Sequence, residues 1–238
     1  MNEKAYSLKR TARYAGFLYL LLTITGVYTL MYVPSQIMVW GDAAATANKM
    51  LAREFLFRTG IVVSLLGNVI FVFVVLALYR LFKDVNERQA KLMVALVLVQ
   101  IPVVFVGAAL DITSLLILKW EMMKALDLPQ RQDMAMMLLS IDRYSTPGLE
   151  LFWGLWLFPL ALLIFRSGFL PRFLSVWLAI NGCAYVILSF TGLLLPQYQD
   201  IVSKVTFPAL FGELAFMLWL LIMGAKRKPS AASVSLAS

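Results

Sequence analysis

Three carboxyl groups lie within long apolar runs of this 238-residue chain, where ionisable side chains are rare. Asp111 occurs in VFVGAALDITSLLIL, Glu150 follows Pro147 by one helical turn, and Glu213 occurs in FPALFGELAFMLWLL. Acids in such surroundings favour a cationic ligand, a proton or a metal ion, or one of them keeps its own proton. Two of them close together could also act as a catalytic carboxylate pair.

Asp111 belongs to a polar stripe on one face of a predicted helix. The five residues of this stripe lie within about 40° on either side of its first residue, on a helix that turns 100° per residue. An ionised group that faces lipid costs about 3 kcal/mol or more, so this face must meet protein or water. The stripe consists of Gln100, Val104, Gly107, Asp111 and Ser114.

We expect the polar faces of several helices to meet in a water-accessible cavity in the outer half of the membrane. Arg58, at the outer start of the second apolar run, is the cation best placed at its rim. The alternative is that the acids are hydrogen-bonded to neighbouring side chains and backbone groups and only fix helix packing. The candidate ligand-binding residues are Asp111, Glu150, Glu213, Arg58, Tyr28, Asn68 and Gln100.

Missing residue types narrow the possible chemistry. The chain has no histidine, which excludes His-ligated zinc or haem and Ser-His-Asp catalysis. Its single cysteine, Cys183, cannot form an intramolecular disulfide or a thiolate cluster, and we expect it to be a small core residue. No glycine-rich phosphate-binding motif occurs. We therefore expect no cofactor and no dedicated metal site, and the sequence identifies no catalytic residue.

The composition is that of a membrane protein. Apolar residues make up 61% of the chain and charged residues only 14%. Six apolar runs are each long enough to cross the hydrocarbon layer as a helix, which takes about 20 residues. The fold class is therefore all-α integral membrane, with six transmembrane helices in one bundle. The predicted spans are 14–37, 59–80, 92–118, 147–166, 173–195 and 204–224.

Two longer connections are predicted to form short amphipathic helices on the outer face. In the first, within 41–58, Ala45, Met50, Leu51 and Phe55 would share one face. In the second, within 128–142, Asp133 is placed to cap the helix. We expect one membrane domain over 1–228 and a disordered cytoplasmic tail over 229–238.

Basic residues indicate the orientation. With the N-terminus inside, the inner flanks hold 13 of the 21 lysine and arginine residues, which predicts cytoplasmic termini. The net charge of +8 is scattered over these flanks without a basic helix, so we expect no nucleic-acid partner. The expected partner is the lipid bilayer of the inner membrane. A protein partner cannot be named from the sequence.

Several sequence stretches resemble a bacterial membrane family known only as domain of unknown function number 4386. The resemblance implies a multi-span inner-membrane protein and no particular substrate. It draws attention to Gly41, Asp42, Thr46, Arg58, Gly212 and Glu213 as signature positions. The resembling stretches are RYAGFLYLL, GDAAATANKM followed by EFLFRTG, LYRLFKDVNERQAKLM, RSGFLPRFLSVWLAINGCAYV and GELAFMLWLLIMG.

Three functions remain open at the level of sequence. The first is binding or transport of a small ligand or cation through the outward-facing acidic cavity. The second is a non-transporting membrane partner or sensor subunit, for which a closed core and a large exposed apolar face would be expected. The third is an intramembrane carboxylate-dependent enzyme, which requires two acids within hydrogen-bonding distance and open to a substrate. No further motif supports this third reading, so we do not expect an enzyme.

Overall fold

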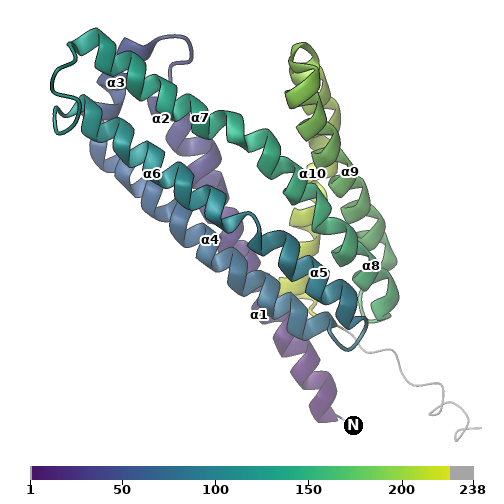
Figure 1. Cartoon of the computed structure of the whole chain (residues 1–238). Coiled ribbons are helices and arrows are strands. Elements are labelled where there is room, and N and C mark those ends of the chain that lie inside the picture. Colours follow the sequence, from purple (N-terminus) through teal and green to yellow (C-terminus); the bar gives the residue numbers. More distant parts are fainter. Residues whose placement is uncertain (1, 226–238) are drawn as a thin grey trace, which may run out of the picture. The chain divides into compact units, whose positions relative to one another are not determined.

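The computed structural model describes residues 2–225, and within this range the chain is helical with no strands (Figure 1). The predicted tail at 229–238 and the predicted domain end at 228 lie outside the described residues. The elements are α1 (Asn2–Val27), a π-helical segment (Tyr28–Tyr32), α2 (Val33–Ile37), α3 (Ala43–Ala52), α4 (Glu54–Phe82), α5 (Glu87–Leu98), α6 (Ile101–Leu118), α7 (Leu128–Leu155), α8 (Leu157–Ser167), α9 (Arg172–Leu194), a 3₁₀ turn (Pro196–Tyr198) and α10 (Gln199–Ile222).

Six helical stretches within the described residues are long and apolar enough to cross a membrane. This confirms the predicted all-helical membrane fold with six spans. The chain is therefore a multi-pass membrane protein. The stretches are Ser7–Ile37, Glu54–Phe82, Glu87–Leu118, Leu128–Ser167, Arg172–Leu194 and Pro196–Ile222.

The described residues divide into two compact units. The first unit contains 2–20, 72–97 and 150–225, and the second contains 21–71 and 98–149. Because α1, α4 and α7 each have residues in both units, each unit is built from segments that are far apart in the sequence.

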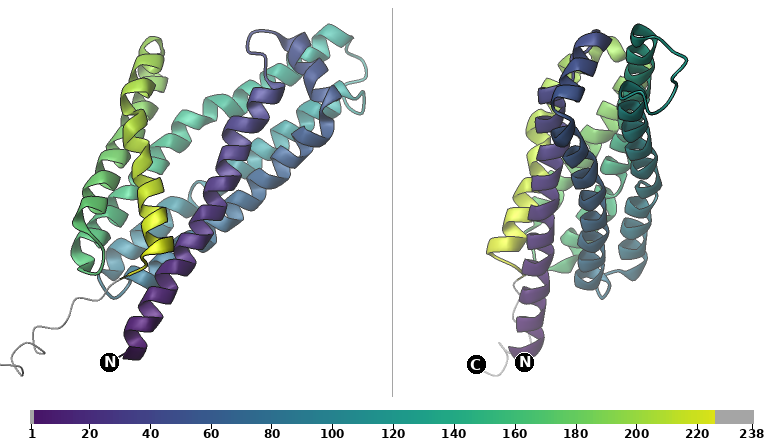
Figure 2. Two further views of the ribbon diagram at one scale, coloured as in Figure 1. Left: turned by 180° about the vertical axis from the view of Figure 1, so that it is seen from behind. Right: turned by 90° about the vertical axis from the view of Figure 1, so that its left-hand side faces the viewer.

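In the first unit, α8, α9 and α10 follow one another through short turns. Gly168 ends α8 with a positive φ of 67°, a conformation that glycine adopts without strain. The Ser175 hydroxyl of α9 donates to the carbonyl of Ala161 in α8 at 2.7 Å. The antiparallel pair α9 and α10 lies side by side in both views (Figure 1 and Figure 2). Cys183 is exposed on α9, so its predicted core position is wrong.

Glycines bring the helices of the first unit close together. A Cβ at Gly154 of α7 would lie 2.6 Å from the carbonyl oxygen of Gly182 in α9. A Cβ at Gly212 of α10 would lie 3.1 Å from the carbonyl oxygen of Trp177, also in α9. Helix α9 therefore meets both neighbours through backbone contacts that a side chain would prevent, as is common where membrane helices pack.

The second unit contains α3, which begins where its sequence provides a cap. The Asp42 carboxylate accepts a hydrogen bond from the amide of Ala45 at 2.8 Å. The Thr46 hydroxyl donates to the carbonyl of Val39 at 3.0 Å and closes the turn that precedes the helix. Two of the signature positions therefore hold this turn together.

Helix α3 is shorter than predicted, so the predicted apolar face does not lie on one helix. Thr46, Ala47 and Met50 are buried, whereas Leu51 is 39% exposed. Phe55 is 82% exposed and belongs to α4. Helix α3 ends before Arg53, and α4 starts at Glu54. Met50 packs in a core of the second unit that includes Val33, Ile37, Leu115 and Leu139.

The second predicted amphipathic helix is the first half of α7. No helix end separates 128–142 from the following residues, and Pro147 lies inside the same helix. The cap is Asp127 and not Asp133: its carboxylate accepts from the amide of Gln130 at 2.9 Å, and the Gln130 side chain accepts from the Asp127 amide at 3.1 Å. Asp133 lies within the helix. The prediction of a separate second helix is therefore wrong.

The contact between Gly154 and Gly182 predicts a position-specific effect of a single methyl group. Gly154→Ala should destabilise the protein by about 1–3 kcal/mol, because the methyl group would overlap the carbonyl oxygen of Gly182. Gly148→Ala is the matched control on α7, since nothing lies within 4 Å of a Cβ there. Thermal unfolding of the detergent-purified variants would test this. Equal melting temperatures for the two variants would contradict the predicted overlap.

Candidate functional site

Glu213 lies at the centre of a polar cluster in the first unit. The Tyr19 hydroxyl of α1 donates to Glu213 Oε2, and the Asn181 side-chain amide of α9 donates to Glu213 Oε1 at 3.4 Å. Tyr19 and Asn181 are buried, at 4% and 0% exposure, and Glu213 itself is partly buried. Three helices thus contribute to the environment of one carboxyl group.

The cluster lies well inside the membrane spans. Glu213 is about nine residues before the end of α10, and Asn181 is about nine residues after the start of α9. At 1.5 Å per residue, each is about 14 Å from its helix end. Because α9 and α10 run antiparallel, these two positions come to the same level. The carboxyl group is therefore remote from both ends of the helices that hold it.

Tyr185 connects Glu213 to the second acid of the unit. It lies one turn after Asn181 on α9, close to both carboxyl groups. Its ring packs edge-on against Trp153 of α7, with 5.9 Å between centroids. Glu150 lies one turn before Gly154, so the close approach of α7 to α9 brings Glu150 toward the Tyr185 side of the cluster.

Several buried oxygen atoms of the first unit have no hydrogen-bond donor among the described residues. They are Asn181 Oδ1, Glu150 Oε2, Ser189 Oγ and Gln199 Oε1, of which the Ser189 hydroxyl can also donate. Asn181 and Ser189 are fully buried, and with Tyr185 they follow one face of α9 at intervals of four residues. A buried acceptor without a donor costs about 1–3 kcal/mol. These atoms therefore create a demand for a hydrogen-bond donor or a positive charge.

Aromatic rings surround the Tyr19 side of the cluster. The Tyr19 ring lies 6.3 Å from Trp156 and 6.3 Å from Phe216, measured between ring centroids. Trp156 and Phe216 are buried, at 1% and 0% exposure. The negative faces of aromatic rings attract cations, so this environment is compatible with the same kind of ligand as the carboxyl group.

The structure brings one predicted acid, Glu213, together with Tyr19, Asn181 and Tyr185, which are not among the predicted ligand-binding residues. Tyr19 was missed, although Ala12, Ala15 and Gly16 precede it at helical spacing and mark a face of α1 that packs closely. A Cβ at Gly16 would lie 2.5 Å from the Leu221 backbone of α10, on the helix that carries Glu213.

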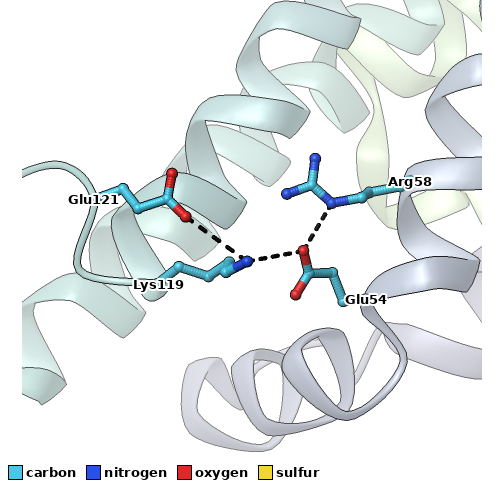
Figure 3. A network of polar contacts seen from close by, with 4 residues as sticks. All are labelled: Glu54, Arg58, Lys119 and Glu121. Carbon is cyan, nitrogen blue, oxygen red and sulfur yellow. Dashed lines mark hydrogen bonds and ion pairs between the residues drawn. The ribbon is translucent and has the colours of Figure 1, made fainter.

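Arg58 pairs with a local acid in the second unit. Its Nε donates to Glu54 Oε1 at 2.7 Å, one turn earlier on α4 (Figure 3). Lys119, just after α6, contacts the same Glu54 oxygen at 3.1 Å and reaches Glu121 at 3.7 Å. These ion pairs join the start of α4 to the end of α6. A role for Arg58 at the rim of an acidic cavity stays a prediction.

The other predicted site residues also lie in the second unit. The Tyr28 hydroxyl is 2.8 Å from the Thr59 hydroxyl, and the Asn68 amide donates to the carbonyl of Ser64 on its own helix at 3.0 Å. Gln100 is buried, and Asp111 is partly buried on α6. Whether the acids of the two units meet in one cavity stays a prediction. Among the described residues, no group of three acidic, histidine or cysteine side chains could hold a metal ion.

Comparisons with known proteins place the chain in a family without assigning an activity. A 79-residue stretch is 35% identical to an uncharacterized protein from Archaeoglobus fulgidus and covers 32% of this chain and 44% of that protein. The chain thus spans less than half the length of that relative. No solved structure matches. The family model for the domain of unknown function DUF4386 matches residues 14–224, which include α10 and Glu213, and the protein therefore belongs to the DUF4386 family.

Proposed function

We propose that this protein binds a small cation or a proton at the Glu213 cluster within the membrane. The observation that carries the proposal is the Glu213 carboxyl group, held by Tyr19 and Asn181 deep in the spans next to buried acceptors without donors. In a purely structural cluster, each buried acceptor would be expected to have a donor, because an acceptor without one lowers the stability of the fold. A bound cation or proton would supply what these oxygens lack.

The arrangement favours binding over catalysis by a pair of acids. The described contacts of Glu213 are with two phenols and an amide, and among the described residues no contact joins Glu213 to Glu150. A carboxylate pair needs two acids within hydrogen-bonding reach of one substrate. Movement of the bound cation across the membrane would make the protein a transporter, and a change in helix packing upon binding would make it a sensor.

We further propose that the protein lies in the inner membrane with both termini in the cytoplasm. The excess of basic residues on the flanks assigned to the inside supports this orientation. The loop between α4 and α5 would then be cytoplasmic, and the loop between α6 and α7 would be external.

The cation proposal predicts that stabilisation by a cation depends on Glu213. We expect the melting temperature of the purified protein to shift when one of four cations is added at constant ionic strength, or when the pH is changed. The cations are sodium, potassium, lithium and a primary alkylammonium. Glu213→Gln should remove this shift because it deletes the negative charge. Tyr19→Phe should weaken it, since one donor that orients the carboxyl group is lost.

Asp200→Asn is the matched control for this experiment, because Asp200 is an exposed acid on the same helix. It should respond to cations as the unmodified protein does. A folded Glu213→Gln protein with an unchanged cation and pH response would refute the proposal. If the cation or pH response does depend on Glu213, proteoliposomes with a pH-sensitive dye inside would show whether protons also cross the membrane.

The orientation predicts which loops a membrane-impermeant maleimide reaches in intact cells. In a Cys183→Ala background, Lys124→Cys should be labelled from outside, and Asp84→Cys should be labelled only after cell lysis. Both positions are exposed in loops, so access to the thiol is set by the side of the membrane. The reverse pattern would invert the proposed topology.

A further inference from the structure

A fully buried arginine in the second unit has donors without acceptors. Arg131, in the first turn of α7, is 0% exposed. Its Nε donates to the carbonyl of Asp127 at 3.3 Å, whereas neither terminal guanidinium nitrogen, NH1 or NH2, has an acceptor among the described residues. The Trp120 ring covers the guanidinium group, with 3.4 Å from the guanidinium carbon to the ring centroid.

No described acid pairs with the terminal nitrogens of Arg131, and the two acids of the preceding loop have other partners. Glu121 contacts Lys119 at 3.7 Å, and the Asp127 carboxylate accepts from the Gln130 amide. The indole ring attracts the positive charge but has no lone pair for the guanidinium N–H groups. A buried charge is normally paired and hydrogen-bonded, because removing it from water without a partner is expensive. The four terminal N–H groups of Arg131 therefore call for an anion that accepts several hydrogen bonds.

The position of Arg131 at the end of a membrane-spanning stretch and the planar shape of its guanidinium group favour a phosphate. The site follows the end of α6 at Leu118, where a membrane-spanning stretch ends. Phospholipid phosphates lie at that level, and tryptophans such as Trp120 concentrate there. The planar guanidinium group matches two phosphate oxygens at once. The start of α7 adds the positive end of a helix.

We propose that Arg131, under the Trp120 ring, binds the phosphate group of a phospholipid headgroup at the start of α7. Trp120 is 55% exposed and lies in the loop between α6 and α7. Because Arg131 is fully buried, a phosphate would reach its terminal N–H groups only when this exposed ring moves aside. The site is separate from the Glu213 cluster in residues and in charge, so either proposal can fail while the other stands.

Melting temperatures of the full chain in a neutral detergent test the proposal. A short-chain phosphatidylglycerol should stabilise the unmodified protein, and Arg131→Met should abolish that stabilisation. Without added lipid, Arg131→Met should melt at the same temperature or higher, because it removes an unpaired buried charge. Arg131→Lys keeps the charge without the planar fork and should bind the lipid about tenfold more weakly.

Arg143→Met is the matched control. Arg143 also lies on α7 and stacks on a tryptophan, Trp40, at 3.9 Å, but it is exposed. This variant should keep the lipid response, which separates a specific site from general attraction of anionic lipid. Inorganic phosphate is tested in parallel. A response to lipid alone supports a headgroup, whereas an equal response to phosphate supports the anion site but overturns its assignment to lipid.

Two results would overturn the anion site itself. One is an unchanged lipid response in Arg131→Met, because the lipid would then bind elsewhere. The other is a lower melting temperature of Arg131→Met and of Arg131→Lys in the absence of lipid, with no lipid response in the unmodified protein. In that case Arg131 only stacks on Trp120 and stabilises the loop.

Discussion

The backbone contact between Gly154 and Gly182 is the constraint on which the first unit depends most. It lets α7 approach α9 within the distance that a Cβ would occupy. Glu150 lies one turn before this contact, and Asn181 lies next to it. A wider separation would move Glu150 away from Tyr185 and leave a gap in an apolar environment, where little besides packing and hydrogen bonds holds helices together. The close contact is therefore also what shapes the polar cluster.

Glu213 illustrates why membrane helices concentrate their polar groups. Its hydrogen bonds come from α1 and α9, so a single carboxyl group fixes the register of three helices. Gly212, the preceding residue, lets α10 contact α9 at Trp177, one turn from Asn181. Gly212 thus lets α10 pack closely against α9, and this close packing allows Glu213 to accept a hydrogen bond from Asn181 of α9. The adjacent signature positions Gly212 and Glu213 therefore act together to hold α10 against α9.

Apolar length and buried acids could be read from the sequence, but the partners of those acids could not. The run around Glu213 shows that an acid lies within a span, because hydropathy depends only on composition. Its hydrogen bond to Tyr19 joins residues 194 positions apart, and no periodicity encodes that. Phe55 was assigned to the wrong helix because the prediction continued one helix through Arg53. Asp133 was chosen as the cap although Asp127 and Gln130 already have the spacing of a capping box in the sequence.

The two units differ in the kind of buried polar group that lacks a hydrogen-bond partner: acceptors in the first unit and donors in the second. In the first unit, the buried groups without partners among the described residues include the acceptors Asn181 Oδ1 and Glu150 Oε2. In the second, they are the donors of Arg131. Buried polar groups rarely stay unmatched in stable proteins, since each costs free energy comparable to a sizeable part of the total stability. A donor-poor centre deep in the spans suits a proton or cation, and a donor-rich centre at the end of a span suits a phosphate. The same rule of hydrogen-bond satisfaction thus leads to two proposed ligands of opposite charge.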